Sequence, residues 1–275
     1  MLPNMGLKCV TEAWRVWRVT QPGADCDKHL LCLKGHNGIC PCHMCKIQAI
    51  WDITGGGTTY YAPLRQPHQC SLPVSSWDLR CLPYRKQECY QGELEEIKST
   101  STKKWSKELS QRHGLNSKCS LLEIPSLQWA VTFPHDFMHL MFENHFKNKI
   151  HMWSGNYKGL SSGQEDYKIE TVVWEQIGCE TAGSVPLIPS AFSHALPNIA
   201  IELWYYTAKD LCFWLLHIGP YVLKNRLGHK YYRHFMKLNW IIKLCLWFMI
   251  SRSDLNELCE LIIEYIQEDE QYMND

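Results

Sequence analysis

The feature that most constrains this chain is a short cluster of cysteine and histidine residues, GHNGICPCHMC, at Gly35–Cys45. Within it, two residues separate Cys42 from Cys45, and a third cysteine and two histidines share the stretch. Two thiolates at this spacing on a turn can both reach one tetrahedral Zn²⁺, which favours sulfur and nitrogen ligands. The cluster therefore predicts a structural zinc site near the front of the chain.

A second segment, FPHDFMHLMFEN at Phe133–Asn144, offers nitrogen ligands. Its His135 and His139 are four residues apart, which predicts two imidazoles on one face of a helix. A zinc site with four ligands can then be built from Cys42, Cys45 and these two histidines. The sequence leaves other ligands open, as well as the alternative of reduced thiols beside a surface histidine pair. The rival ligands are His36, Cys40, His43 and His145.

Acidic residues lie close to both segments. Asp136 stands inside the second one, and Asp25 and Asp27 precede the cysteine cluster. Carboxylate oxygens suit Mg²⁺ or Mn²⁺, and pairs of such ions drive phosphoryl transfer. The alternatives are structural: Asp136 follows Pro134 at a position typical of a helix N-cap, and the other two can simply be solvated.

Charge is distributed unevenly along the chain, although the formal net charge is zero. Residues 1–120 hold 16 Lys and Arg against 10 Asp and Glu, a balance of +6, and residues 121–275 hold 12 against 18, a balance of −6. A neutral chain has no global attraction to nucleic acid. Contacts with phosphate are therefore expected from the front half or from Lys98–Lys107, unless that stretch is a solvated loop.

The 14 cysteines and the apolar segments indicate a reducing compartment and no membrane insertion. The start MLPNMGLKCV has no apolar core of a signal peptide, so most cysteines are expected to be small buried side chains. The longest apolar stretch, Trp240–Ile250, contains Lys243 and is too short to span a bilayer.

Hydrophobic spacing divides the chain into three parts. Residues 1–65 are short and broken, with an alternating strand-like stretch at Trp14–Thr20; residues 66–120 read as a polar linker; and residues 121–275 are strongly helical. Within the linker, a surface helix at Glu93–Leu109 is expected to be interrupted near Ser99–Thr102. The predicted fold class is mainly α with a small β part.

Several features of the helical part follow from local signals. Apolar spacing predicts a helix over Asp136–Trp153. Thr207–Asp210 has the form of a capping box at the start of a further helix, which Pro220 should shorten or kink. A long apolar helix is expected over Tyr231–Ile250, and Ser251–Asp254 should cap a last helix whose acidic end frays because the helix dipole disfavours negative charge there. The aromatic residues at helical spacing are expected in the core, and the alternative is that they stack on bases. They are Trp153, Trp174, Trp204–Tyr206, Trp214, Trp240 and Trp247.

Taken in order, several motifs resemble the CACTA-type (En/Spm-like) DNA transposases found in fungal genomes. They are GHNGICPCHMCKI, GGGTTYYAPL, LLEIPSL, FPHDFMHLMFEN, EDYKIETVVWEQIG, IPSAFSHALPNIA and FWLLHIGPYVL, and they cover essentially the whole chain. The resemblance implies a transposase of the DDE class, which holds two metal ions with acidic residues on an RNase H-like fold. It further implies a nuclear protein that acts on transposon ends in DNA.

The resemblance also assigns residues. Cys42, Cys45 and His139 match a zinc pattern typical of a helical insertion in related recombinases, and Asp136 matches the aspartate of a D-x-M-H motif. His135 is not a usual residue of the family. With His36 as the fourth candidate ligand, the expected zinc site is Cys42, Cys45, His139 and His36, and the expected acidic residues are Asp25 and Asp136.

The sequence departs from the family before the cysteine cluster. The family has Asp-x-Pro-Ala there, whereas this chain reads QPGADCDKHLLCLKGH, with its aspartates after the proline. The family's first catalytic aspartate would lie upstream of this chain, and a further acidic segment would lie beyond Asp275. The chain is therefore expected to be a truncated member, a fragment of an RNase H-like core with a large helical insertion that is catalytically incomplete. Besides DNA, the expected partners are full-length transposase relatives. The alternative to a transposase-derived function is a non-enzymatic zinc-binding helical interaction protein or a decayed remnant.

Overall fold

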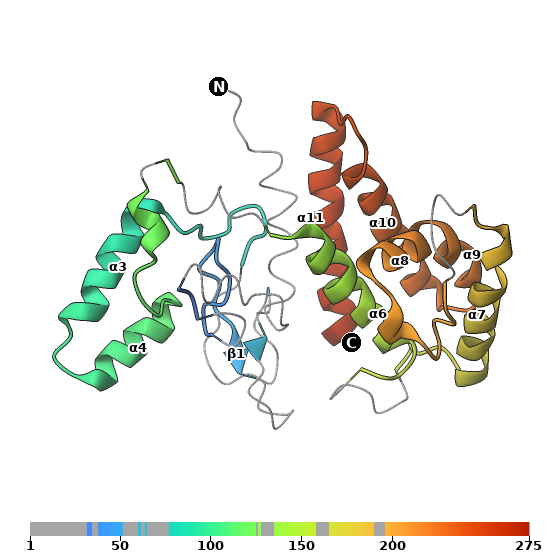
Figure 1. The fold of residues 1–275 in the computed structure, drawn as a ribbon, viewed down its shortest axis with the longest axis horizontal. Helices are drawn as coiled ribbons and strands as arrows, with labels where there is room; N and C mark the ends of the chain where they lie inside the picture. The colour runs from blue at the N-terminus through green and yellow to red at the C-terminus, as the bar shows by residue number, and fades with distance from the viewer. Residues whose placement is uncertain are drawn as a thin grey trace. The chain divides into compact units, whose positions relative to one another are not determined.

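A computed structural model describes residues 32–34, 38–51, 60–61, 64, 77–124, 126–127, 135–157, 165–189 and 196–274. The chain divides into two compact units. Unit 1 is Met1–His135 together with Ile262–Asp275, and unit 2 is Asp136–Leu261. The described residues are mainly helical, which confirms the predicted mainly α class (Figure 1). The predicted strand at Trp14–Thr20 lies outside the described residues.

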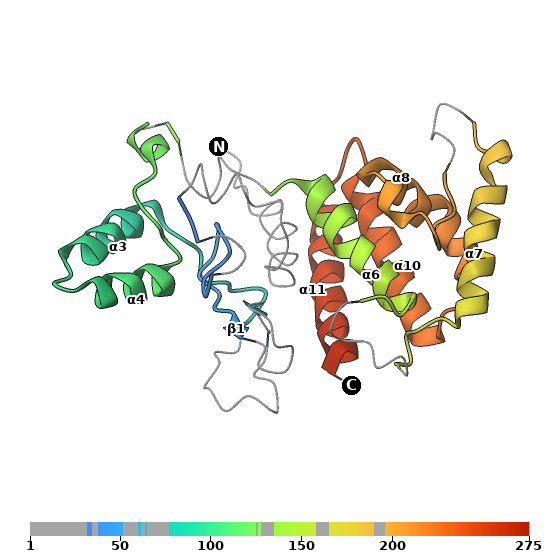
Figure 2. The ribbon, with the colours of Figure 1, turned by 60° about the horizontal axis from the view of Figure 1, so that its bottom comes forward.

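Unit 1 is built from two helices, a two-stranded ribbon and extended segments. Strands β1 (Ile50–Trp51) and β2 (Tyr60–Tyr61) pair antiparallel, with Ile50 opposite Tyr61. Helices α3 (Gln87–Ser99) and α4 (Lys103–His113) lie side by side (Figure 2). A short 3₁₀ helix covers Ser120–Glu123. A buried cluster joins α3 to its surroundings; its members are Leu33, Tyr90, Leu94, Leu115 and Cys119.

The boundaries of α4 follow from capping residues. The hydroxyl of Thr102 accepts a hydrogen bond from the backbone N–H of Trp105, as an N-cap residue does. Gly114 ends the helix at φ 70°, a left-handed conformation that favours glycine. The helix predicted over Glu93–Leu109 is thus confirmed, with its interruption between Ser99 and Lys103, but it begins earlier and ends later than predicted.

Unit 2 is a bundle of helices, and the last helix of the chain, α11 (Arg252–Asn274), begins in unit 2 and continues into unit 1 from Ile262. Its first helix is a π-helix, η2 (His139–Phe146), continued by α6 (Lys147–Trp153), which confirms the helix predicted over Asp136–Trp153. The later elements are α7 (Thr171–Gly183), 3₁₀ helices at Val185–Leu187 and Leu203–Tyr205, α8 (Ala208–Phe213), π-helix η5 (Trp214–Ile218), α9 (Gly219–Val222), α10 (His229–Cys245) and α11 (Arg252–Asn274).

Aromatic side chains fill the centre of unit 2. Phe146 lies 5.8 Å from Trp214 and 6.3 Å from Phe235 between ring centroids, and Trp153 lies 5.7 Å from Phe235. The buried indole of Trp214 donates a hydrogen bond to the Thr181 hydroxyl at 3.1 Å. The predicted burial of tryptophans is therefore confirmed here and at Trp174. It is wrong for Trp204, Trp240 and Trp247, whose side chains are exposed.

Pro220 divides a single predicted helix into three elements. Proline has no N–H, so the carbonyl of Leu216 loses the hydrogen bond that an α-helix would give it. The chain forms the π-helix η5 at this point, and the side-chain amide of Asn239 on α10 donates to the carbonyls of Leu215 at 2.7 Å and Leu216 at 3.4 Å. Shortening is not observed, because helical structure continues through α9 to Val222. The proline is accommodated instead by the π-helix and by the buried Asn239.

Capping residues also fix where α8 and α11 begin. The predicted capping box is present: Asp210 N–H donates to the Thr207 hydroxyl, and the Asp210 carboxylate accepts from Thr207 N–H. Ser251 and Asp254 exchange the corresponding bonds at the start of α11. The expected fraying of the acidic end is wrong, because α11 continues to Asn274 and the Glu270 carboxylate accepts a hydrogen bond from Leu64 N–H at 2.6 Å.

Two other sequence predictions concern thiols and membranes. All eleven cysteines that the structure describes are free thiols. Five of them, Cys259 included, are buried, so the expectation that most cysteines are buried is not confirmed; Cys81, Cys89 and Cys179 are exposed. In the described residues, no helix is both long enough and apolar enough to cross a bilayer.

Candidate functional site: the cysteine–histidine loop

The cysteine cluster lies on an extended loop that is held by backbone pairing with residues 83–85. Cys45 forms an antiparallel bridge with Tyr84, Lys46 N–H donates to the Pro83 carbonyl at 2.8 Å, and Arg85 N–H donates to the Met44 carbonyl at 2.9 Å. Cys40, Cys42, His43 and Cys45 are all buried on this loop. Its backbone is thus fixed on one side by a neighbouring segment of unit 1.

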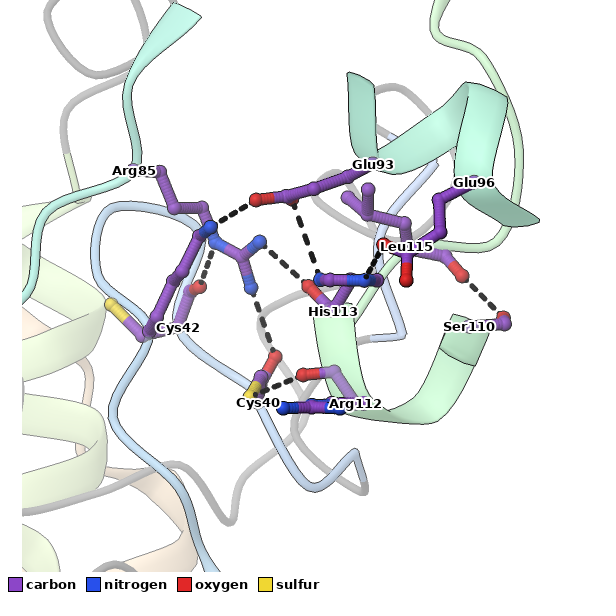
Figure 3. Close-up of polar contacts among 10 residues, drawn as sticks. Cys40, Cys42, Arg85, Glu93, Glu96, Ser110, Arg112, His113 and Leu115 are labelled. Carbon is purple, nitrogen blue, oxygen red and sulfur yellow. Dashed lines mark hydrogen bonds and ion pairs between the residues drawn. The ribbon is translucent and has the colours of Figure 1, made fainter. Parts of the chain in front are cut away.

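The buried guanidinium of Arg85 ties this loop to the C-terminal end of α4 (Figure 3). It donates hydrogen bonds to the carbonyls of Cys42 at 3.0 Å, His113 at 2.7 Å and Cys40 at 3.3 Å. Carbonyls at a helix C-terminus carry partial negative charge, so they favour a cation there. The side chain therefore joins three separate backbone groups around one buried charge.

Gly114 allows the close approach of α4 to the loop. A Cβ at this position would lie 2.3 Å from the carbonyl oxygen of Cys40 and 2.8 Å from the Arg85 guanidinium. Because the first of these neighbours is backbone, it cannot move aside as the end of a side chain does. The positive φ and the close contact therefore both require glycine at this position.

An ion-pair network lies on the outer side of the Arg85 contacts. The Glu93 carboxylate is buried and pairs with Lys46 from the loop, and it lies 3.9 Å from His113 Nδ1. The other ring nitrogen of His113 lies 2.9 Å from Glu96 (Figure 3). The network links the loop to both α3 and α4.

The three cysteines of the loop differ in their chemistry. The Cys40 thiol donates a hydrogen bond to the Arg112 carbonyl at 3.0 Å, and its burial raises its pKa. The pKa of Cys42 is instead held well below its usual range, first by a hydrogen bond from Cys45 and then by a hydrogen bond from His135 and by the positive charges of His135 and His43, against the opposing effect of burial. Cys40 is thus a neutral donor, whereas Cys42 has the surroundings of a thiolate.

Two histidines complete the cluster around Cys42. The rings of His43 and His135 are in contact, with centroids 4.1 Å apart and planes inclined at 51°. Met44 N–H also points to the Cys42 sulfur at 3.4 Å. Cys42, Cys45, His43 and His135 therefore form a compact set of two sulfur and two imidazole donors, which we call the Cys/His cluster.

The donor types of the Cys/His cluster fit a tetrahedral Zn²⁺. Two sulfurs bound to one such ion at about 2.3 Å lie about 3.8 Å apart, a spacing close to that of sulfur hydrogen-bonded to sulfur. In the part of the chain that the structure describes, however, no group of three or more His, Cys, Asp or Glu side chains is already arranged to hold a metal ion. The cluster brings the right donors together in a hydrogen-bonded arrangement.

The second predicted segment forms a separate, exposed group. Asp136 caps the helix, since its carboxylate accepts from Met138 N–H at 2.9 Å and His139 N–H at 3.2 Å. The His139 ring pairs with Glu143 and lies 3.8 Å from the second carboxylate oxygen of Asp136. His139 and Asp136 are more than half exposed, at 56% and 59%. Zinc ligation by His139 and metal binding by Asp136 stay predictions.

His135 is not part of the helix that follows it, because the helix is capped at Asp136. The expectation that His135 and His139 lie one turn apart on one helical face is therefore wrong for a structural reason. Two further predicted residues, Asp25 and His36, lie outside the described residues.

Two residues of these groups were not predicted from the sequence. The contact of Glu143 with His139 could have been predicted, since side chains four residues apart meet on a helix. The role of Arg85 could not, because its partners are carbonyl groups 28 to 45 residues away in the chain.

No protein-family model, no curated protein and no solved structure matches this chain.

Proposed function

We propose that this chain is a transposase-derived protein of the CACTA type, in which the Cys/His cluster binds one structural Zn²⁺. The ancestral activity in this proposal is metal-dependent cleavage and strand transfer of DNA in the nucleus. The observation that carries the zinc site is the meeting of four donors, three from the cysteine loop and one, His135, from a segment about ninety residues away. The three loop donors are Cys42, His43 and Cys45. The motifs that resemble the transposase family support the ancestry.

The chemistry of the cluster supports zinc over a purely apolar role. A buried thiol in apolar surroundings is usually neutral, and burial alone would raise its pKa. The surroundings of Cys42 do the opposite, and they lower its pKa by a sulfur donor and two imidazoles. Zinc replaces the protons that these donors share and releases them to solvent. Cys40 is left out of the proposed ligand set, because its thiol donates to the Arg112 carbonyl at 3.0 Å and its burial raises its pKa.

The remaining roles are proposed from the resemblance. Asp136 would supply a carboxylate for Mg²⁺ or Mn²⁺ if the chain acts on DNA, and Asp25 is the second acidic candidate. The carboxylate of Asp136 is exposed, so an ion could reach the oxygen that does not cap the helix. Proposed partners are transposon ends in DNA and full-length relatives of the chain.

A second candidate function is supported by an exposed apolar turn between α10 and α11. Leu246, Trp247, Phe248, Met249 and Ile250 are consecutive and exposed, with Phe248 and Met249 at 102% and 84%. Exposed apolar patches of this kind mark interaction sites. This observation favours a non-enzymatic, zinc-binding helical interaction protein as the alternative.

Metal analysis of the purified full chain tests the zinc site. We expect one zinc per chain, lost in Cys42→Ser, Cys45→Ser and His135→Ala. Cys81→Ser is the matched control, because Cys81 is an exposed thiol of the same unit. His139→Ala separates the two histidines: retention of zinc in this variant supports the Cys/His cluster. A wild-type protein without zinc, or loss of zinc in the Cys81 control, would contradict the proposal.

A further inference from the structure

A surface cavity of about 450 Å³ lies where α3 ends and α4 begins. Three lysines line it, Lys98 from α3 and Lys103 and Lys107 from α4. Serine and threonine residues, among them Ser101 and Ser106, make up most of the remaining lining, together with Ile97 and Asn116. The volume is within the range of small-molecule sites, roughly 300–1,000 Å³.

Among the residues that the structure describes, no acidic side chain neutralises the positive charge of this cavity. No carboxylate is among the lining residues. Within the described parts of the chain, none of the ion pairs involves Lys98, Lys103 or Lys107. A fourth lysine is close: the pKa of Lys34 is lowered, first by its burial and second by the charge of Lys107. Repulsion among these ammonium groups would be relieved by a bound anion.

Positive charge also continues beyond the cavity along the same segment. Residues 98–118 hold six Lys and Arg residues and one Glu, a balance of +5. Lys104 and Lys118 belong to this set without lining the cavity. A single anion would be held by the cavity alone, whereas a chain of phosphates could use the flanking charges as well.

We infer that the cavity between α3 and α4 binds a backbone phosphate of a nucleic acid strand. Lysine acts as a point charge toward phosphate, and the serine hydroxyls can donate hydrogen bonds to its oxygens. No aromatic side chain lines the cavity, so a base has nothing there to stack on. The strand is therefore bound through its backbone and without preference for base sequence. The inference does not depend on the zinc site.

Fluorescence anisotropy with a short labelled single-stranded DNA of mixed sequence tests this site in the full chain. The cavity variant is Lys103→Gln/Lys107→Gln, and the matched control is Lys209→Gln/Lys224→Gln, which removes the same charge from two exposed lysines of unit 2. Loss of two phosphate contacts should make the slope of log K against log salt shallower by about 1.4 and weaken binding roughly tenfold at physiological salt. The control should change both quantities much less.

Three outcomes would overturn the inference: no binding by the wild type, equal weakening in both double variants, or adenosine monophosphate that competes as well as the strand does. The last outcome would identify a free nucleotide as the ligand. Lys103→Arg/Lys107→Arg should restore binding because it restores the charges, and circular dichroism shows whether each variant keeps its helices. Zinc content is measured separately, so failure here is distinguishable from failure of the zinc proposal.

Discussion

Replacing Arg85 by methionine should open the loop that carries the Cys/His cluster. Methionine keeps much of the apolar volume of the side chain but cannot donate to the carbonyls of Cys40, Cys42 and His113. Each hydrogen bond lost to a buried carbonyl costs about 1 kcal/mol, so the three together cost about 3 kcal/mol. This is a large part of the total stability of a domain, which is about 5–15 kcal/mol.

Native-state hydrogen exchange measures this effect where it is expected. The amide of Lys46 donates to Pro83 and the amide of Ala49 donates to Ile39, so both report opening of the loop. Their protection should fall roughly a hundredfold in Arg85→Met, which corresponds to about 3 kcal/mol. The amides of α10 belong to unit 2 and should be unchanged.

Arg80→Met is the control, because Arg80 is an exposed arginine of the same unit. In this variant the free energy of opening measured at the Lys46 amide should stay within about 0.5 kcal/mol of the wild-type value, as it usually does for surface substitutions. The reasoning is refuted if Arg85→Met does the same, since the three hydrogen bonds would then contribute nothing to holding the loop. Arg85→Lys should be intermediate, because an ammonium group cannot reproduce the planar fork of a guanidinium.

Three other predictions concern contacts inside each of the two units. Asn239→Leu should destabilise unit 2 by about 1–3 kcal/mol in urea unfolding, because it leaves buried carbonyls of the π-helix without a donor, and the effect should shrink in a Pro220→Ala background. Gly114→Ala should destabilise unit 1 by more than about 1 kcal/mol, measured by the same method, because both its φ and its contact with Cys40 exclude a Cβ. The pKa of Glu180 is lowered, first by its hydrogen bonds to Arg226, so its stabilisation is present above the pKa of the unfolded chain and is lost as the pH falls through the folded value; Glu180→Gln should remove this acid dependence from the thermal unfolding profile.

The helical part of the fold was predictable because its signals are local. The capping box at Thr207–Asp210, the cap at Ser251 and the break at Pro220 each depend on residues within one or two turns. The persistence of the acidic end of α11 was not predictable from dipole arguments alone. There the buried Glu270 accepts a hydrogen bond from the distant residue Leu64, and this tertiary contact outweighs the unfavourable dipole.

The cysteine loop shows the opposite case. The Cys-x-x-Cys spacing indicated the paired sulfurs, but nothing in it distinguishes Cys40 from Cys42. The difference arises because the C-terminal carbonyls of α4 reach the Cys40 thiol, while His135 reaches Cys42. Both partners come from 70 or more positions away, and only the tertiary fold brings them together.

The two histidines of the second segment show why a spacing rule needs its structural context. A four-residue separation places two side chains on one face only if both residues lie inside the helix. His135 does not meet this condition. The Asp136 carboxylate accepts hydrogen bonds from two backbone N–H groups as an N-cap does, so the helix begins after His135. Extending the helix to include His135 would remove this cap at a cost of about 1 kcal/mol. His43 needs no such change to meet His135, since their rings are already in contact. The ligand set that requires the least rearrangement is therefore Cys42, His43, Cys45 and His135.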